Sequence, residues 1–254
     1  MKYVRYQQSS DNPAYGILEG DIITKIDGNL FGEWQKGSKQ VARGAVKLLA
    51  PCLPSKIIGV GRNYLLHIKE TNAEVPSYPL IFLVPGTSVI NPGDAIIHPK
   101  EYERVDYEGE IGVVIGKKAS KVKKADASDY ILGYTCSNDV SCRTMIWSDK
   151  HWSRGKGQDT FSPIGPVITD EIDPMNVMLE TRLNGDVKQH SSTSDMLFDI
   201  PTLIEFITAG ITLLPGDIIQ TGTPSGIGPI KEGDVVEVEI EGIGILSNPV
   251  VMEK

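Results

Sequence analysis

A turn-and-strand pattern that occurs four times is the feature that most constrains the fold of this 254-residue chain. In each copy a glycine and an aspartate precede a run of apolar residues, and the copies lie at 19–23, 92–97, 215–219 and 232–236. Glycine permits the tight turn, aspartate can hydrogen-bond to nearby backbone, and the apolar run leaves the turn as a strand. The copies are irregularly spaced, so they mark turns rather than structural repeats. They predict a β-rich chain with many short strands.

Composition and charge narrow the class of protein. Hydrophobic residues make up 40% of the chain and charged residues 23%, as in a globular protein, and the formal net charge is −8. That charge argues against nucleic-acid binding, which needs a basic face. It suits an anionic substrate only if a cation or a basic cluster reverses the field inside the site. No apolar run is long enough to span a bilayer, and the N-terminus has no apolar leader core, so we expect a soluble, unprocessed cytoplasmic protein.

The small number of thiols and imidazoles argues against a Cys/His zinc site. The chain has three cysteines, Cys52, Cys136 and Cys142, which form no Cys-x-x-Cys pair, and it has four histidines. Such a set offers little to a zinc ion that prefers thiolate and imidazole ligands. The odd number of cysteines predicts free thiols in a reducing cytoplasm.

A small N-terminal unit is expected over 1–54. Strands at 15–18 and 22–26 should form a hairpin, and Ser38 is expected to cap an amphipathic helix that runs to Leu49. Pro51 and Pro54 end this helix, and residues 51–54 form a linker to the rest of the chain.

The second unit, over 55–254, is expected to be dominated by strands. Apolar and acidic residues alternate over 236–240, which is the pattern of a half-buried antiparallel strand. Helices are expected to begin near Asn63, after Asp139 and at Pro201. Because strands and helices do not alternate as in βαβ units, the sequence predicts a mainly β fold with a few short helices, of the α+β class.

Three motif-like stretches do not qualify as functional motifs. The glycines at 59–61 are followed by Tyr64 where a dinucleotide-binding fingerprint needs its third glycine. The stretch 112–117 is one residue short of a phosphate loop, and no serine or threonine follows its lysine. Ser225 lies between a proline and a glycine and not in a Gly-x-Ser-x-Gly elbow. On these grounds we reject nucleotide binding and serine-hydrolase chemistry.

Two glutamates in the stretch 106–116 are the first candidates for chemistry. Glu108 and Glu110 lie two apart on an expected strand and so point to the same face, beside glycines that remove bulk. Adjacent carboxylates repel each other unless a cation or a proton lies between them. A solvated strand face is the ordinary alternative, and we assign it to the second Glu-x-Glu pair, Glu237 and Glu239, which lacks flanking glycines.

A third carboxylate, Asp139, lies where an expected strand runs into the start of a helix. Taken alone, Asp139 would be read as a helix N-cap. A ligand at the end of a strand is also a common functional placement. Three carboxylates suit hard Mg²⁺ or Mn²⁺, with water or substrate oxygens completing the coordination. The sequence therefore offers Glu108, Glu110 and Asp139 as a candidate metal site.

From about residue 56 to its end, the chain resembles the fumarylacetoacetate hydrolase family in a series of short stretches that follow the family's order. Each stretch is short, but their combination is specific. The stretches are Gly61-Arg62-Asn63-Tyr64 with His67 and Glu70, Tyr107-Glu108-Gly109-Glu110, Val114-Ile115-Gly116, Gly133-Tyr134-Thr135, Asn138-Asp139, Ser141-x-Arg143, Lys156-x-x-Asp159, Pro163-x-Gly165-Pro166, Leu183-Asn184-Gly185, Gln189, 193–196 and 221–228. The resemblance implies a distorted β-barrel or roll, a homodimer, and Mg²⁺ or Mn²⁺ bound at Glu108, Glu110 and Asp139.

The resemblance also implies which groups are catalytic. His67 and Glu70 lie three apart on the helix expected near Asn63, so they share a face and would otherwise be read as a surface pair. At the matching positions the family has a catalytic dyad, often on a segment that closes over the substrate. Lys156, which alone would be read as a loop lysine, is implied to contact the substrate carboxylate or the developing enolate, with Asp159 nearby.

Candidates for substrate binding complete the set: Arg62, Arg143, Asp159 and Thr223. The hydroxyl of Thr223 and backbone N–H groups around Gly222 suit a carboxylate or an oxyanion. Arg143 is either part of a structural ion pair or a substrate anchor. At Ile146 the chain departs from the many family members that carry a substrate-binding glutamine. Trp152 is expected either to line the pocket or to pack against the helix.

The function implied first is hydrolysis or decarboxylation that breaks a C–C bond of a small 2-oxo acid, such as an acylpyruvate or oxaloacetate. A 2-hydroxymuconate-type isomerase of aromatic-acid degradation is the main alternative, and a dehydratase of 2-oxo-3-deoxy sugar acids is another. A metal-binding relic without turnover is the non-enzymatic alternative, and the presence of His67, Glu70 and Lys156 weighs against it. A metal-stabilised enolate serves hydrolysis and decarboxylation alike, while the isomerase shuttles a proton along a 2-hydroxydiene.

Overall fold

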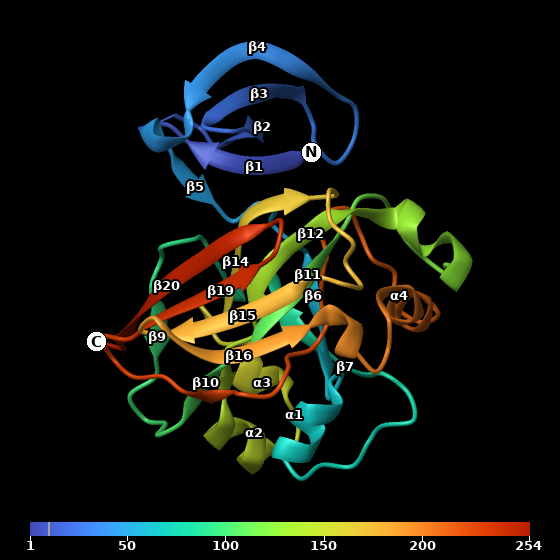
Figure 1. The fold of residues 1–254 in the computed structure, drawn as a ribbon, viewed down its shortest axis with the longest axis vertical. Coiled ribbons are helices and arrows are strands. Elements are labelled where there is room, and N and C mark those ends of the chain that lie inside the picture. Colours follow the sequence, from blue (N-terminus) through green and yellow to red (C-terminus); the bar gives the residue numbers. More distant parts are fainter. Residues whose placement is uncertain (10) are drawn as a thin grey trace.

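Strands dominate the computed structural model, which describes residues 1–9 and 11–254, and the helices are few and short, as the sequence predicts (Figure 1). The largest sheet contains, in spatial order, β4 (Trp34–Ala42), β3 (Ile22–Gly28), β2 (Ala14–Glu19), β1 (Lys2–Gln7), β14 (Ser162–Thr169), β12 (Ile131–Asn138), β11 (Gly109–Ile115), β17 (Ile218–Gln220), β6 (Lys56–Gly61) and β7 (Leu80–Pro85). Two further strands pair with β1 and β14 respectively, namely β5 (Lys47–Leu49) and β8 (Val89–Ile90).

Two smaller sheets complete the β structure. The larger of them has the order β16 (Asp186–Ser192), β15 (Met178–Leu183), β19 (Val235–Ile240), β20 (Gly244–Met252) and β9 (Ile96–His98). The smaller has the order β13 (Ser141–Cys142), β10 (Val105–Tyr107) and β18 (Gly228–Pro229). The predicted alternation over 236–240 is confirmed in β19, where alternate residues are buried between antiparallel partners.

The first five strands form the small N-terminal unit, drawn in blue at one end of the molecule in Figure 1. The predicted hairpin is confirmed as β2 and β3. The predicted helix over 38–49 is wrong, because this stretch forms most of β4, a turn and β5. Gly44 and the β-branched Val41 and Val46 weaken a helix here, whereas pairing with β3 and β1 satisfies the backbone. Since β1 also pairs with β14, the N-terminal unit and the larger unit share one sheet.

In the part of the chain that the structure describes, four α-helices lie between the strands, in addition to short 3₁₀ helices: α1 (Leu65–Glu70), α2 (Arg143–Asp149), α3 (Ser153–Lys156) and α4 (Ile200–Thr208). The predicted helix at Pro201 is confirmed as α4, and the side chain of Asp199 accepts a hydrogen bond from Thr202 N at its start. The helix after Asp139 is α2, and Cys142 occupies its N-cap position without a side-chain capping hydrogen bond, so Asp139 is not an N-cap. Within the described residues, no helix is long and apolar enough to cross a membrane. The three cysteines are free and buried.

Strand β11 carries part of the candidate metal site into the protein interior. All seven of its residues are buried, and its four apolar side chains belong to three apolar clusters on both faces of the strand. Gly109 is required by close packing, since a Cβ atom there would lie 2.0 Å from Thr181 Oγ1. Figure 1 shows α1, α2 and α3 at the end of the molecule opposite the N-terminal unit. Any site that joins β11 to these helices is therefore enclosed by packed elements.

Candidate active site

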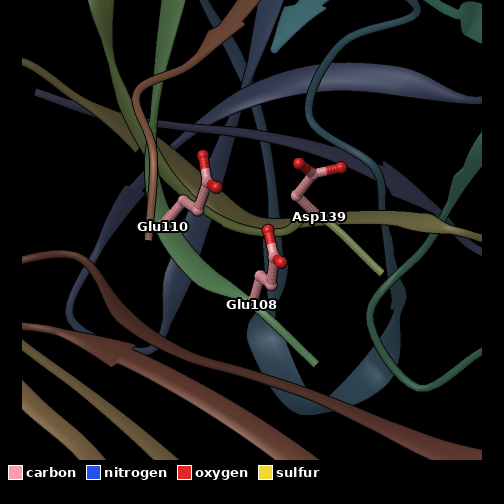
Figure 2. A group of neighbouring side chains, drawn as sticks. All are labelled: Glu108, Glu110 and Asp139. Atoms are coloured by element: carbon pink, nitrogen blue, oxygen red, sulfur yellow. The ribbon is translucent and has the colours of Figure 1, made fainter. Parts of the chain in front are cut away.

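Three carboxylates converge from two adjoining strands (Figure 2). Glu108 directly precedes β11, Glu110 lies on it, and Asp139 directly follows β12. The two strands are antiparallel neighbours, and Asp139 N donates to Glu108 O at 2.9 Å. One carboxylate oxygen from each residue lies within 4.8 Å of the others, and the residues are 4%, 1% and 1% exposed. The structure thus brings the three predicted ligands together inside the protein.

Two cationic side chains contact this triad. Lys156 Nζ donates to Glu108 Oε2 at 2.8 Å and also donates to Asp139 Oδ2. Arg143 donates to Glu108 Oε1 and, through Nε, to Asp106 Oδ2 at 2.8 Å. The fully buried Asp106 was not identified from the sequence, because no sequence pattern distinguishes a functional aspartate at this position from an ordinary surface aspartate. Both oxygens of Glu108 are therefore bonded to positive groups.

The donor set fits a hard divalent ion, because all three candidate ligands are carboxylates. Asp139 Oδ1 is buried and has no hydrogen-bond partner. Glu110 accepts a hydrogen bond from Gly222 N at 2.8 Å, and within residues 1–9 and 11–254 no cationic side chain forms an ion pair with it. The buried ammonium of Lys156 shows that the site already attracts positive charge. The residues present therefore fit Mg²⁺ or Mn²⁺.

Burial and mutual repulsion control the ionisation of the triad. Burial raises the pKa of Glu110 well above its usual range, and the charge of Asp139 adds to this rise. Burial also raises the pKa of Asp139 to about 6, against the opposing charge of Lys156. For Glu108, burial opposes ionisation, but Lys156 and Arg143 outweigh it and lower the pKa to about 2. When no metal ion is bound, protons therefore bind preferentially to Glu110 and Asp139.

Metal binding should stabilise the fold more at about pH 7.5 than at about pH 5.5. A raised carboxyl pKa means that the folded protein holds a proton that the unfolded chain releases. Holding this proton stabilises the folded protein, and that stabilisation is lost as the pH rises through the pKa of the folded state, which is about 6 for Asp139. A divalent ion must displace that proton only at the lower pH. Melting temperatures with and without Mn²⁺ measure the difference, which Asp139→Asn should flatten. Equal shifts at both pH values would contradict the expectation.

His67 and Glu70 share one face of α1. His67 Nδ1 lies 3.2 Å from Glu70 Oε2, and Glu70 Oε1 accepts a hydrogen bond from Gly226 N at 3.0 Å. His67 is 8% exposed and lines the same cavity as Glu108. Because Nδ1 is engaged by Glu70, Nε2 is the ring nitrogen left to face a reactant. The arrangement suits a base that takes and returns a proton.

A cavity of about 250 Å³ is lined by His67 and, among the three carboxylates, by Glu108. Among the predicted substrate-binding residues, Arg62, Arg143 and Thr223 line this cavity, as does Lys156. Asp159 does not, because it is exposed and lines a separate hollow beside the C-terminal residues. The size of the cavity suits a small molecule rather than a drug-sized one.

Apolar side chains form the other walls of this cavity. Ile146 and Trp147 come from α2, and Trp152 comes from the turn before α3. The ring of Trp152 packs edge-on against Phe82, with centroids 5.4 Å apart. Gly61 makes room for it, since a Cβ atom at this position would lie 2.3 Å from the indole. Trp152 thus lines the pocket, as one of its two expected roles required, and it packs on β6 and β7 rather than against a helix. The sequence pattern gave no reason to single out Trp147.

Comparisons with known proteins place the chain in a family. The family model for the fumarylacetoacetate (FAA) hydrolase C-terminal region matches residues 56–251, and the Rv2993c-like N-terminal model matches residues 1–51. Protein Rv2993c of Mycobacterium tuberculosis is 52% identical over 96% of both chains. Oxaloacetate tautomerase fahd2, mitochondrial, of Xenopus laevis is 43% identical over 99% of this chain and 90% of its own. A crystal structure of 5-carboxymethyl-2-hydroxymuconate delta-isomerase from Mycobacterium smegmatis superposes with a TM-score of 0.94, at 44% identity over the whole of both chains. This chain therefore belongs to the fumarylacetoacetate hydrolase family.

Proposed function

We propose that this protein is a metal-dependent enzyme that interconverts the keto and enol forms of a small 2-oxo acid by moving a proton at the carbon beside the keto group. One observation carries the proposal. A single small cavity presents the imidazole of His67 beside Glu108 of the carboxylate triad, with Lys156 and Arg143 in the same wall. Relatives named for tautomerase and isomerase reactions support this choice of reaction.

Glu108, Glu110 and Asp139 would hold the metal ion. Such an ion, when bound, withdraws electron density from a 2-oxo group and favours the loss of a neighbouring proton. Lys156 and Arg143 add positive charge beside the same position, so they stabilise the negative charge of an enolate. Thr223 also lines the cavity, and its hydroxyl donates to Gly109 O at 2.9 Å, which fixes this part of the wall to the strand that carries Glu110.

The proton transfer itself is assigned to His67. In the keto-to-enol direction, its Nε2 takes a proton from the carbon beside the keto group and delivers it to the former keto oxygen, and the reverse transfer restores the keto form. Glu70 holds the ring through Nδ1 during both transfers. Ile146, Trp147 and Trp152 add apolar surface to the cavity wall. These walls limit access of water and thereby favour return of the proton to carbon or oxygen over attack by water.

Keto–enol exchange and bond cleavage leave different products. We expect the Mn²⁺- or Mg²⁺-loaded protein to accelerate loss of the enol absorbance of freshly dissolved oxaloacetate without matching release of CO₂ or pyruvate. Solvent deuterium should enter the carbon beside the keto group at a matching rate, as followed by NMR. Absence of both effects, for oxaloacetate and for a panel of acylpyruvates and hydroxymuconates, would contradict the proposed function.

Cleavage of a C–C bond, by hydrolysis or decarboxylation, is a second candidate. Lys156 and Arg143 favour it, because two positive groups in one wall would stabilise an enolate that departs as well as one that forms in place. Release of pyruvate with CO₂ from oxaloacetate, or of pyruvate with a second acid from an acylpyruvate, would establish this activity in the experiment above.

Arg62 is proposed to bind a carboxylate of the substrate. It lines the cavity, is half-buried, and holds its guanidinium 5.9 Å from the ring centroid of Trp152. Its backbone has a φ of 56°, an unusual value for a residue other than glycine. Within the described ranges no acidic side chain forms an ion pair with Arg62, so its charge is available to a ligand.

We expect Arg62→Leu to raise KM for oxaloacetate roughly ten- to hundredfold, the usual effect of losing a charged hydrogen bond. The value of kcat should change much less, because the proton-transfer groups are untouched. Arg43, a half-buried arginine of the N-terminal unit, provides the matched control as Arg43→Leu. Steady-state kinetics of both variants make the comparison, and an unchanged KM for Arg62→Leu would argue against this assignment.

A further inference from the structure

The segment 221–228 donates backbone hydrogen bonds to both halves of the site. Gly222 N donates to Glu110 Oε2 at 2.8 Å, and Gly226 N donates to Glu70 Oε1 at 3.0 Å. Both glycines have a positive φ, 99° and 98°, and a Cβ atom at Gly226 would lie 2.0 Å from Lys188 O. One short segment therefore spans from a metal ligand to the residue that orients His67.

The end of this segment near the metal site is fixed to β11. Thr221 Oγ1 and Thr223 Oγ1 donate to backbone carbonyls of β11, each at 2.9 Å. The fully buried Gln189 joins the same parts, because its Oε1 accepts from Gly109 N at 2.9 Å and its Nε2 donates to Thr223 Oγ1 at 2.7 Å. The position of Gly222 beside Glu110 is thus determined by several hydrogen bonds.

The end near α1 is held by Tyr107. The phenol is 2% exposed, and its hydroxyl donates to Gly226 O at 2.8 Å. Tyr107 is also the residue directly before Glu108, and it pairs with Gly228 across β10 and β18. Glu70 needs such an external partner, since α1 has only six residues and the Glu70 side chain is 35% exposed. A chain of hydrogen bonds consequently runs from Tyr107 through Gly226 and Glu70 to His67.

We propose that Tyr107 is a positioning residue for the proton-transfer pair. By fixing Gly226, it holds Glu70 in the orientation that directs His67 towards the cavity, and it ties this orientation to the strand segment that carries Glu108. The inference rests on the proposed function, in which His67 and Glu70 move the proton. Within the described residues, the Tyr107 hydroxyl donates to no carboxylate of the triad, and Tyr107 is not among the residues that line the cavity.

Tyr107→Phe deletes this hydrogen bond and keeps the ring. We expect kcat for oxaloacetate enol–keto exchange to fall roughly tenfold, because small misplacements of a catalytic group are costly, with KM changed less than about twofold. The affinity for Mn²⁺, measured by titration calorimetry, should be unchanged. Tyr6→Phe is the matched control, since Tyr6 is also a buried tyrosine but lies in β1 of the N-terminal unit. An unaltered kcat, or a loss of Mn²⁺ affinity in proportion to kcat, would overturn the inference.

A double-mutant cycle with Glu70→Gln separates this inference from the proposed function. If Tyr107 acts through Glu70, Tyr107→Phe should lower kcat far less in the Glu70→Gln background than in the wild-type protein. Additive losses would overturn the positioning role while leaving the proposed function intact. If Glu70→Gln alone leaves turnover unchanged, the proposed role of the pair fails instead. Melting temperatures of all four proteins show whether any loss reflects unfolding.

Discussion

His67→Ala should lower kcat for keto–enol exchange at least about hundredfold, the scale of a lost general base. His67 is the only group assigned to take and return the proton, and Glu70 holds it at 3.2 Å. The imidazole accepts or donates no hydrogen bond to the carboxylate triad, so metal binding should persist. Folding should persist as well, because the histidine contributes little to the apolar clusters. Initial rates, Mn²⁺ titration and circular dichroism together test these three expectations.

His190→Ala is the matched control for this variant. His190 Nδ1 also faces a glutamate, Glu180 Oε2, at 3.3 Å, but its side chain is 61% exposed on β16. Loss of this histidine should leave kcat and KM unchanged. Unchanged kinetics for His67→Ala would exclude the proposed pair, and a loss of metal affinity in that variant would show that His67 supports the triad instead.

Removal of the metal ion should abolish turnover, and its return should restore it. Charge stabilisation of several kcal/mol by a Lewis acid corresponds to a rate loss of roughly a thousandfold or more. Chelation followed by dialysis, and then addition of Mg²⁺ or Mn²⁺, tests this directly by initial rates. Full activity after chelation, with metal content confirmed as absent, would remove the proposed role of the ion.

Variants of the ligands should reproduce the effect of chelation. Asp139→Asn retains the size of the side chain but removes the charge of a ligand that faces Lys156, so Mn²⁺ affinity and kcat should fall together. Glu237→Gln is the control, because Glu237 and Glu239 form a Glu-x-Glu pair that contacts Arg182 on the surface of β19. Loss of activity in the control, or wild-type metal affinity in Asp139→Asn, would contradict the assignment.

The parts of the site that follow from local periodicity were accessible from the sequence. Residues two apart on a strand point to the same face, which predicted that Glu108 and Glu110 lie together. Residues three apart on a helix share a face, which predicted the same for His67 and Glu70. Asp139 joined the glutamates only as a third carboxylate at a strand end, because no local pattern states that β12 lies beside β11. The resemblance to a family was required to connect these residues with His67 and Glu70. The β-rich class followed from turn residues, whose backbone preferences are local.

Features set by packing were not accessible in this way. The stretch 38–49 has an amphipathic pattern but pairs with β3, because tertiary hydrogen bonding outweighs helix preference. Asp159 follows Lys156 by only three residues, but α3 ends at Lys156, and Asp159 lies at a different surface hollow. Asp106 and Gly226 act through partners that lie 35 or more positions away in sequence, such as Arg143 and Glu70. Only coordinates reveal such pairings.

The ammonium of Lys156 is an internal counterion, covalently attached to the protein, for the carboxylate triad. Held between Glu108 and Asp139, it neutralises part of the buried negative charge before any ion arrives. Binding of Mg²⁺ or Mn²⁺ at the triad would therefore be an exchange, in which the incoming ion would compete with the Lys156 ammonium and leave that ammonium free to contact the substrate. Such competition would weaken the net affinity for every ion, while the ammonium would help to keep the metal-free protein folded. The enzyme should accordingly tolerate cycles of metal loss and reloading without denaturing.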